Sequence, residues 1–547
     1  MISFLAQVVN PPANGSCVGP AGTLISLCQA KGTIHLPVAY RSIAPMLVMA
    51  GGALLLLGLS AIIPKRTRPG LWPLLTMGIG GAAAIVSAWE WSDVHKHGGS
   101  ITVGGQVVYD EFTVFFTLLV GVATVLAGLF SDSYLRRENL DGVEAYALIL
   151  LAGAGAMLMA EAAGLIMLFL GLEIMSIALY VLTAYHRRRA ESGEAGLKYF
   201  ILGSFSSAIF LYGAALVYGA TGSTQFADMG AYLSRNTLTN NGVLLAGMAL
   251  LVVGLCFKVA AVPFHFWTPD VYQGAPTPFG GYMAAVAKAG GFAGLMRVLI
   301  GGLSTQQFDW RPILWVVAVL TLLVGSVLAI VQRDLKRMLA YSSISQAGYV
   351  LIAVESGTAE GVSAALFYLL TYAFIIAGSF AVVSALQGRG EERNDLGVVQ
   401  GLSKRQPWLA GAMLVFLLAQ AGVPLTSGFL GKFYVIEAAV DAHQYPLAVI
   451  GMLAAAIAAF FYLRVALLMY GSEPDPAKDS TLTAGLRPIA GFDPPGTTAT
   501  LIDAPPSTKV TVAATVWIGL TVCVAFTVFA GVSDPVVNFA HKATMLF

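Results

Sequence analysis

Three lysines and one glutamate lie inside long apolar runs of this sequence. Lys258, Lys288 and Lys432 each interrupt one run, and Glu173 lies near the centre of a fourth. A charged side chain at bilayer depth costs at least ~2.5–3.5 kcal/mol, so charges in four separate segments are improbable as accidents. An amine and a carboxylate can each bind and release a proton. We therefore expect these four residues to form a functional site within a membrane.

The composition indicates which elements carry these residues. Of 547 residues, 57% are hydrophobic and only 11% are charged, which predicts an all-α polytopic membrane protein. A helix of about 20 residues crosses a hydrocarbon layer ~30 Å thick, and runs of that length predict about fourteen transmembrane helices. The runs are 42–63, 70–92, 110–131, 143–161, 163–185, 195–221, 242–265, 277–301, 311–331, 335–356, 361–387, 407–439, 445–471 and 509–535.

The basic residues of the loops predict the orientation of the chain. They cluster in alternate loops, and the positive-inside rule places those loops in the cytoplasm and both termini outside. The clusters are Lys65, Arg66 and Arg68; Arg136 and Arg137; Arg187, Arg188 and Arg189; Arg333, Lys336 and Arg337; and Arg389, Arg393, Lys404 and Arg405. By the same alternation the loop 472–508 is cytoplasmic. A formal net charge of +1, without a basic tail, argues against nucleic acid as a partner.

Cofactor motifs are missing from the sequence. It has no CxxC, no Cys/His cluster with metal-ligand spacing, no P-loop and no dinucleotide fingerprint, so we expect no metal or nucleotide site and no redox centre in this chain. Cys256 and Cys523 fall in apolar runs and are expected to pack as small hydrophobic residues. Cys17 and Cys28 fall in an exported N-terminal extension, 1–41, where they either form a disulfide or stay free.

Two of the apolar runs contain a proline close to a lysine. Pro263 follows Lys258 by five residues, and Pro424 precedes Lys432 by eight. Proline removes a backbone donor and clashes with the preceding turn, so each helix is expected to break there. Paired broken helices are typical of inverted-repeat transporters, whose site lies near the midplane.

The two breaks divide the chain into candidate repeats. The predicted arrangement has helices one to three in 42–131, a first five-helix repeat in 143–301 and a second in 311–471, followed by a last helix and tail in 509–547. The short matches LMRV at 295–298 and YLRV at 462–465 fit this pairing, although two matches of that length can arise by chance.

Four stretches of the sequence resemble the antiporter-like proton-pumping subunits of respiratory complex I. The similarity extends over about residues 110–470, and its most specific part surrounds Lys258. The stretches are FLGLE at 169–173, GLKYF at 196–200, FKVAAVPFHFWTPDVYQGAPTP at 257–278 and DLKRMLAYSSISQAG at 334–348. The resemblance implies an antiporter-like fold with two inverted repeats.

Within that family, the chain is most similar to the subunit N type of NADH-quinone oxidoreductase. The larger homologues and the Mrp-type antiporters typically carry histidines and a lysine in the helix that corresponds here to 361–387. This chain has Phe367, Tyr368, Tyr372 and Phe374 at that place. The long lateral helix of the largest subunit does not follow the run 509–535.

The resemblance implies a role for each buried charge. Glu173 matches a glutamate that pairs with the lysine at position 258, Lys288 matches a central relay lysine, and Lys432 matches the group that passes the proton outward. Burial disfavours the charged form of a lysine and a nearby carboxylate favours it, so movement of Glu173 could switch how tightly Lys258 holds its proton. The alternatives are a static ion pair, an amine held by carbonyl oxygens, and a lysine that reaches the membrane surface.

Three further residues are candidate site residues, and for each of them a purely structural role explains the sequence about as well. His265 could bridge proton sites near neutral pH or cap the helix break. Lys198 could relay protons or extend toward the membrane surface. Glu144 could face a neighbouring subunit or be a solvated carboxylate at a helix start.

Three other charged residues are expected to have structural roles. Arg297 and Arg464 are expected to reach carbonyl oxygens or lipid headgroups. Asp270 precedes a proline-rich turn and is expected to shape that loop rather than carry protons.

The resemblance implies a proton-translocating subunit in a bacterial plasma membrane. Flavin, iron–sulfur clusters and quinone would reside in partner subunits, and the neighbours would be the antiporter-like subunit M and the small subunits K and J. The alternatives are a subunit of an Mrp-type cation/proton antiporter and a scaffold that only spaces its neighbours. A scaffold would gain nothing from the desolvation cost of the four buried charges.

Overall fold

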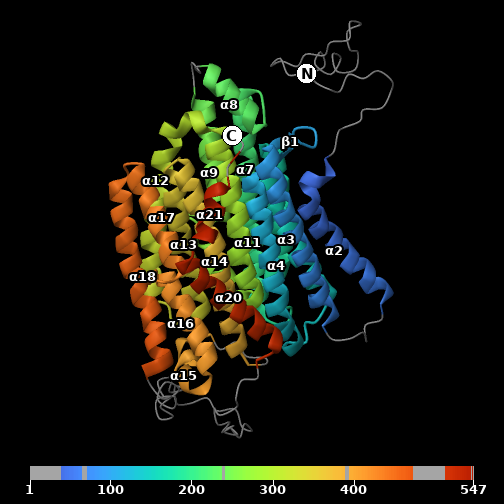
Figure 1. Cartoon of the computed structure of the whole chain (residues 1–547), viewed down its shortest axis with the longest axis vertical. Helices are drawn as coiled ribbons and strands as arrows, with labels where there is room; N and C mark the ends of the chain where they lie inside the picture. Colours follow the sequence, from blue (N-terminus) through green and yellow to red (C-terminus); the bar gives the residue numbers. More distant parts are fainter. Residues whose placement is uncertain are drawn as a thin grey trace, which may run out of the picture.

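The computed structural model describes residues 39–63, 70–236, 241–388, 394–471, 512–543 and 545. These residues form a bundle of helices that run mostly along one axis (Figure 1). Nearly all of the predicted extension 1–41, with Cys17 and Cys28, lies outside the described residues, as do the predicted loop 472–508 and the basic residues Lys65, Arg66, Arg68, Arg389 and Arg393.

The helices of the first part of the chain follow the predicted runs closely. They are η1 (Tyr40–Ile43), α2 (Ala44–Ile62), α3 (Leu71–His97), α4 (Glu111–Arg137), α5 (Val143–Glu161), α6 (Leu165–Thr183), α7 (Ala190–Thr221), α8 (Phe226–Arg235), α9 (Gly242–Lys258), α10 (Trp267–Gly274), α11 (Thr277–Met296) and η2 (Arg297–Gly302). A two-stranded antiparallel hairpin, β1 (Ser100–Thr102) and β2 (Val107–Tyr109), connects α3 to α4.

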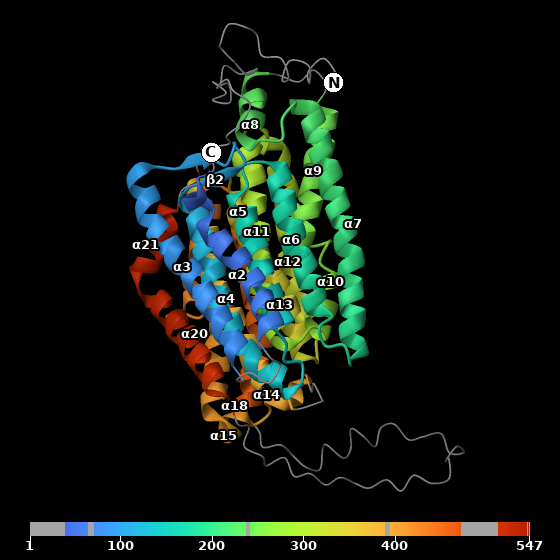
Figure 2. The same cartoon turned by 90° about the vertical axis from the view of Figure 1, so that its right-hand side faces the viewer.

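The second part of the chain is also helical. Its helices are η3 (Ser304–Gln306), α12 (Gln307–Ile330), α13 (Leu335–Glu355), α14 (Ala359–Leu386), η4 (Leu396–Val399), α15 (Leu402–Arg405), α16 (Pro407–Ala421), α17 (Ser427–Asp441), α18 (Tyr445–Gly471), α20 (Ala514–Val532) and α21 (Asp534–Lys542). Figure 2 shows α7 and α9 together at one edge of the bundle, where the two helices pack against each other.

Eleven of the described helices are long and apolar enough to cross a membrane. The predicted spans 242–265 and 407–439 are not among them. The first is helical only as far as Lys258, in α9, and the second is divided into the shorter helices α16 and α17. The predicted span 335–356 forms α13, whose serines and glutamine lower its hydropathy. Almost every residue of α13 is buried among other helices, so it does not need an apolar surface toward lipid.

The centre of the bundle is formed by α11 and α14, which pack against each other. In α14 the most apolar stretch is entirely buried. Large apolar side chains on the outer helices α2, α7, α12 and α18 are exposed instead, as expected for helices that face lipid. The hairpin β1–β2 and the short amphipathic helices α8 and α21 were not predicted, because each is much shorter than the apolar runs of about 20 residues from which the spans were predicted.

Candidate proton-transfer site

Lys258 is the last residue of α9, and the predicted helix break follows it directly. The chain resumes as a helix only at Trp267. Backbone groups freed by the break find other partners: the Trp267 indole donates to the Phe257 carbonyl oxygen at 3.0 Å, and the Val262 amide donates to the Thr321 hydroxyl at 2.9 Å. These contacts satisfy the buried polar backbone and fix the break in place.

The Lys258 ammonium faces hydroxyl groups of two other helices. Lys258 is 3% exposed. Its Nζ donates to Ser176 Oγ on α6 at 2.8 Å and to Tyr199 OH on α7 at 3.3 Å. A β-carbon at Gly291 of α11 would lie 2.8 Å from Val259 and 3.4 Å from the Lys258 side chain, so glycine allows α11 to approach the end of α9 this closely.

Glu173 lies one helical turn before Ser176 on α6 and does not contact Lys258 directly. Its side chain is half-buried, and its Oε1 is buried without a hydrogen-bond partner in the described part of the chain. Glu173 stands three residues before Ser176, whose hydroxyl accepts from Lys258. The expected direct Glu173–Lys258 ion pair is therefore replaced by an arrangement in which the Ser176 hydroxyl contacts the ammonium.

Lys288 lies in the middle of α11, the central helix. It is 3% exposed, and its Nζ donates a hydrogen bond to the Ser343 carbonyl oxygen of α13. The ammonium also lies 5.5 Å from the ring centre of Tyr372 on α14. Ser343 Oγ and Tyr372 OH are buried nearby and have no hydrogen-bond partner among the described residues.

Lys432 lies in α17, just after the second break. The last carbonyl oxygens of α16 accept from its Nζ, that of Gln420 at 2.7 Å and that of Ala421 at 3.0 Å. A helix C-terminus carries partial negative charge and so favours a cation there. Because Lys432 is 7% exposed and points at these carbonyls, it does not extend to the membrane surface.

A network of polar side chains lies between Lys288 and Lys432. Ser342 Oγ contacts Tyr462 OH and donates to Gln420 Oε1 at 3.0 Å. The Gln346 amide donates to Tyr462 OH at 2.9 Å, and Tyr368 OH donates to Gln346 Oε1. At one end of the network, the backbone carbonyl of Gln420 accepts from Lys432. At the other end, Ser342 lies next to Ser343, whose backbone carbonyl accepts from Lys288.

Lys198 is separate from the buried lysines. Its side chain is 44% exposed, and its Nζ pairs with Glu194 at 2.7 Å and with Asp270 at 2.8 Å. Asp270 also accepts from Arg337 at 2.7 Å, so it joins α7, α10 and α13 at one end of the bundle. The expectation that Asp270 shapes this region agrees with these contacts.

The structure does not bring His265 or Glu144 into contact with a buried lysine. His265 lies half-buried in the first break, and its Nδ1 has no hydrogen-bond partner within the described residues. Glu144 is exposed in the first turn of α5. Within the described part of the chain, no hydrogen bond or ion pair joins any two of the seven predicted site residues.

The two arginines expected to be structural both reach carbonyl oxygens. Arg297 is fully buried and donates to both carboxylate oxygens of Asp110, at 2.8 and 2.7 Å, and to the Ala160 carbonyl at 3.1 Å. Arg464 donates to the Ile330 carbonyl at 3.0 Å. Within the described residues, no three His, Cys, Asp or Glu side chains are grouped in a way that could hold a metal ion.

Comparison with known protein families shows to which family the chain belongs. Residues 162–458, more than half of it, match the transmembrane family described as NADH:quinone oxidoreductase/Mrp antiporter. The chain belongs to this family. Among its members, a protein of Trichlorobacter lovleyi named NADH-quinone oxidoreductase subunit N is 43% identical, with 82% of this chain and 90% of that protein covered. A protein of the same name from Chloroflexus aggregans is 41% identical, with 86% and 96% covered.

Two solved structures share the fold of this chain. A chain of respiratory complex I from Thermus thermophilus has a TM-score of 0.68 at 29% identity, with 89% of this chain and 98% of that chain covered. A chain of the Mrp complex from Dietzia sp. has a TM-score of 0.77 at 21% identity, with 92% and 97% covered. The second likeness shows the fold alone.

Several polar residues around the lysines escaped the sequence reasoning. Ser176, Tyr199, Ser342, Gln346, Gln420 and Tyr462 all contact a buried lysine or the network between two of them. The signal that could have found part of this set is the run YSSISQ at 341–346, which is polar inside a span otherwise rich in apolar residues. Uncharged side chains cost less to bury than charges, so they stand out less in a membrane sequence.

Proposed function

We propose that this chain is the N-type membrane subunit of a respiratory NADH-quinone oxidoreductase, and that its buried lysines carry protons across the membrane. Similarity to proteins of that name over about four fifths of the chain supports the assignment. The observation that carries the proton-transfer role is the burial of Lys258, Lys288 and Lys432 within one helical bundle. Lys258 and Lys432 adjoin helix breaks, where Lys258 donates to hydroxyl groups and Lys432 to backbone carbonyl oxygens.

In the first half, Glu173 would control the charge of Lys258. When the carboxylate approaches, it favours the ammonium form, and when it withdraws, burial favours the neutral amine. The Ser176 hydroxyl can accept from the ammonium or donate to the neutral amine, so it can remain bonded to Lys258 in both states. Moving one charge against 100 mV takes ~2.3 kcal/mol, which a modest shift in one buried charge pair could supply.

Lys288 in α11 and Lys432 in α17 would act at the two ends of the polar network. Both donate to backbone carbonyl oxygens, which accept hydrogen bonds but have no proton to pass on. A transfer step therefore requires each ammonium to leave its carbonyl for a hydroxyl, an amide or a water molecule. Tyr368 and Tyr372 are ordinarily neutral at pH 7, with a usual pKa of ~10 for tyrosine, so the lysines are the groups that change charge.

We further propose that the subunit lies in a bacterial plasma membrane with both termini outside, beside the antiporter-like subunit M and the small subunits K and J. Electron transfer through flavin, iron–sulfur clusters and quinone would take place in other subunits. Glu144, exposed at the start of α5, would face a neighbour, and Lys198 and His265 would serve on the proton path at either side of Lys258.

The assembly is tested by purifying the tagged chain in mild detergent and identifying what co-purifies. Peripheral flavin and iron–sulfur subunits, with NADH-driven proton uptake that does not depend on sodium, support the proposal. If the chain belongs to an Mrp-type antiporter, we expect sodium/proton exchange and no NADH dehydrogenase subunits among the co-purified proteins. If it is a scaffold, we expect those subunits to co-purify and proton pumping to stay unchanged when the lysines are replaced.

A further inference from the structure

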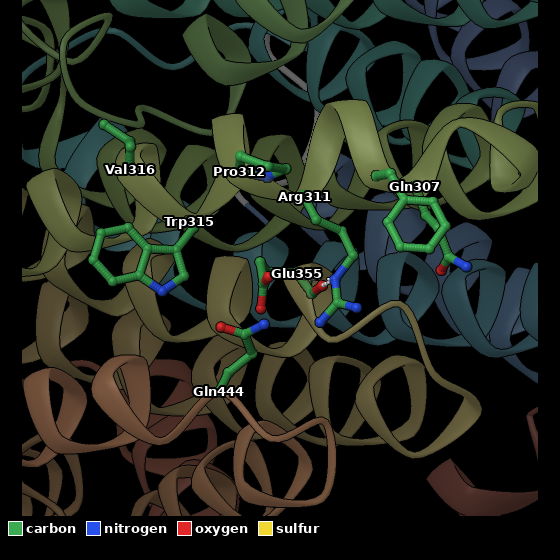
Figure 3. Close-up of a pocket in the computed structure, with 8 residues that line it drawn as sticks. Gln307, Arg311, Pro312, Trp315, Val316, Glu355 and Gln444 are labelled. Atoms are coloured by element: carbon green, nitrogen blue, oxygen red, sulfur yellow. Dashed lines mark hydrogen bonds and ion pairs between the residues drawn. The ribbon is translucent and has the colours of Figure 1, made fainter.

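A cavity of about 490 Å³ opens where the first turns of α12, the last residue of α13 and the α17–α18 connection meet. Figure 3 shows Arg311, Glu355 and Gln444 gathered around it, with Trp315 beside them. None of the residues that line it is used in the proton-transfer proposal. Its lining combines opposite charges with an apolar wall.

The two charged residues of the cavity each keep one unsatisfied atom. Arg311 Nε donates to the Glu355 carbonyl at 2.9 Å and to its Oε1 at 3.3 Å. Arg311 Nη2 and Glu355 Oε2 are buried and have no hydrogen-bond partner in the described part of the chain. Glu355 is 1% exposed, and a buried carboxylate oxygen without a donor is costly. The cavity therefore offers one free cationic donor and one free anionic acceptor.

The apolar wall and the position of the cavity indicate a membrane ligand. Phe308 is 85% exposed and Val316 is 51% exposed, and both line the cavity together with Trp315. The cavity lies at helix ends, which is where lipid headgroups meet a membrane protein. Aromatic side chains such as Trp315 are enriched at that depth.

We propose that this cavity binds the headgroup of a zwitterionic aminophospholipid. The phosphate accepts from Arg311 Nη2, the primary ammonium donates to Glu355 Oε2, and an acyl chain lies along Trp315 and Val316. An anionic lipid without an amine leaves Glu355 Oε2 unsatisfied. A choline headgroup has no N–H with which to satisfy it.

The test uses the full complex reconstituted in nanodiscs that contain a trace of photoactivatable phosphatidylethanolamine, phosphatidylcholine or phosphatidylglycerol. Crosslinks are mapped by mass spectrometry. We expect phosphatidylethanolamine to label the peptide that contains Trp315 about tenfold more than either other lipid, as one added charge-assisted hydrogen bond predicts. Equal labelling by all three lipids, or a crosslink to a neighbouring subunit at this place, would overturn the proposal.

Matched variants separate the two contacts. Glu355→Gln should remove the preference for phosphatidylethanolamine while leaving phosphatidylglycerol labelling unchanged, and Arg311→Gln should lower labelling by all three lipids. The controls Asp309→Asn and Arg235→Gln replace exposed charges outside the cavity and should leave labelling unchanged. Water-soluble glycerophosphoethanolamine should not compete, since it lacks acyl chains. A lipid site would be contradicted if glycerophosphoethanolamine abolished the labelling. It would also be contradicted if the control variants changed the labelling as much as the cavity variants do.

Discussion

The ammonium nitrogen of Lys258 lies 2.8 Å from the hydroxyl oxygen of Ser176, one helical turn beyond Glu173. No ion pair joins Lys258 to Glu173 in the described structure, and one oxygen of that carboxylate is buried without a partner. A carboxylate that is near but not bound can approach and withdraw without breaking a strong contact. This relationship makes Glu173 suited to modulate Lys258 rather than to hold it.

Replacing Glu173 by glutamine tests that modulation. Glu173→Gln keeps the size and hydrogen-bonding capacity of the side chain but removes its charge. We expect NADH-driven proton pumping by the assembled complex to fall nearly as far as in Glu173→Ala, by about ten- to a hundredfold if the carboxylate sets the proton affinity of Lys258. Full pumping in the glutamine variant would leave only a structural role for this residue.

Lys432 provides a test of whether the position must release its proton. Lys432→Arg keeps a positive charge beside the α16 carbonyls but cannot deprotonate under physiological conditions. We expect both Lys432→Arg and Lys432→Ala to reduce pumping in proteoliposomes, with no dependence on sodium. An active arginine variant would show that the charge alone suffices, and sodium-dependent transport would favour the antiporter alternative.

The sequence predicted the buried charges and the two helix breaks because both leave strong local signals. A lysine in an apolar run is conspicuous, and so is a proline beside it. The partners of the lysines were not predictable from local signals. Ser176 lies 82 residues from Lys258, and Gln420, although only twelve residues from Lys432, is an uncharged residue like Ser176. The direct contact of Glu173 with Lys258 was expected from the resemblance alone. The residue that contacts Lys258 is instead Ser176, one turn further along α6, and sequence spacing does not resolve a difference of one turn.

The polar network is tested through Tyr462. Its hydroxyl accepts from Gln346 and contacts Ser342, so Tyr462→Phe leaves both without that partner. We expect pumping to slow and the free energy of unfolding to fall by about 1–3 kcal/mol, the usual cost of an unsatisfied buried group. Tyr282→Phe is the control, since Tyr282 is a buried tyrosine whose hydroxyl donates to the Ile149 carbonyl outside the network. Equal slowing in both variants would contradict a specific role for the network.

Replacing Arg297 tests whether its buried ion pair with Asp110 stabilises the fold. Arg297→Met leaves Asp110 buried without its bidentate partner, which should cost about 3–5 kcal/mol and lower the melting temperature of the purified complex. Arg464→Met removes a single bond to a carbonyl and should cost less. Adding Asp110→Leu to Arg297→Met should recover part of the loss. A melting temperature for Arg297→Met equal to that of wild type would contradict the assigned role of the pair.

Proton uptake by the assembled Lys258→Ala complex tests the central claim most directly. The complex is reconstituted in proteoliposomes, its subunit content is matched to wild type, and initial proton uptake is measured together with NADH oxidation. We expect both rates to fall by about a hundredfold, the typical contribution of a positioned proton-transfer group. Wild-type proton uptake in the assembled variant would show that protons cross the membrane without Lys258.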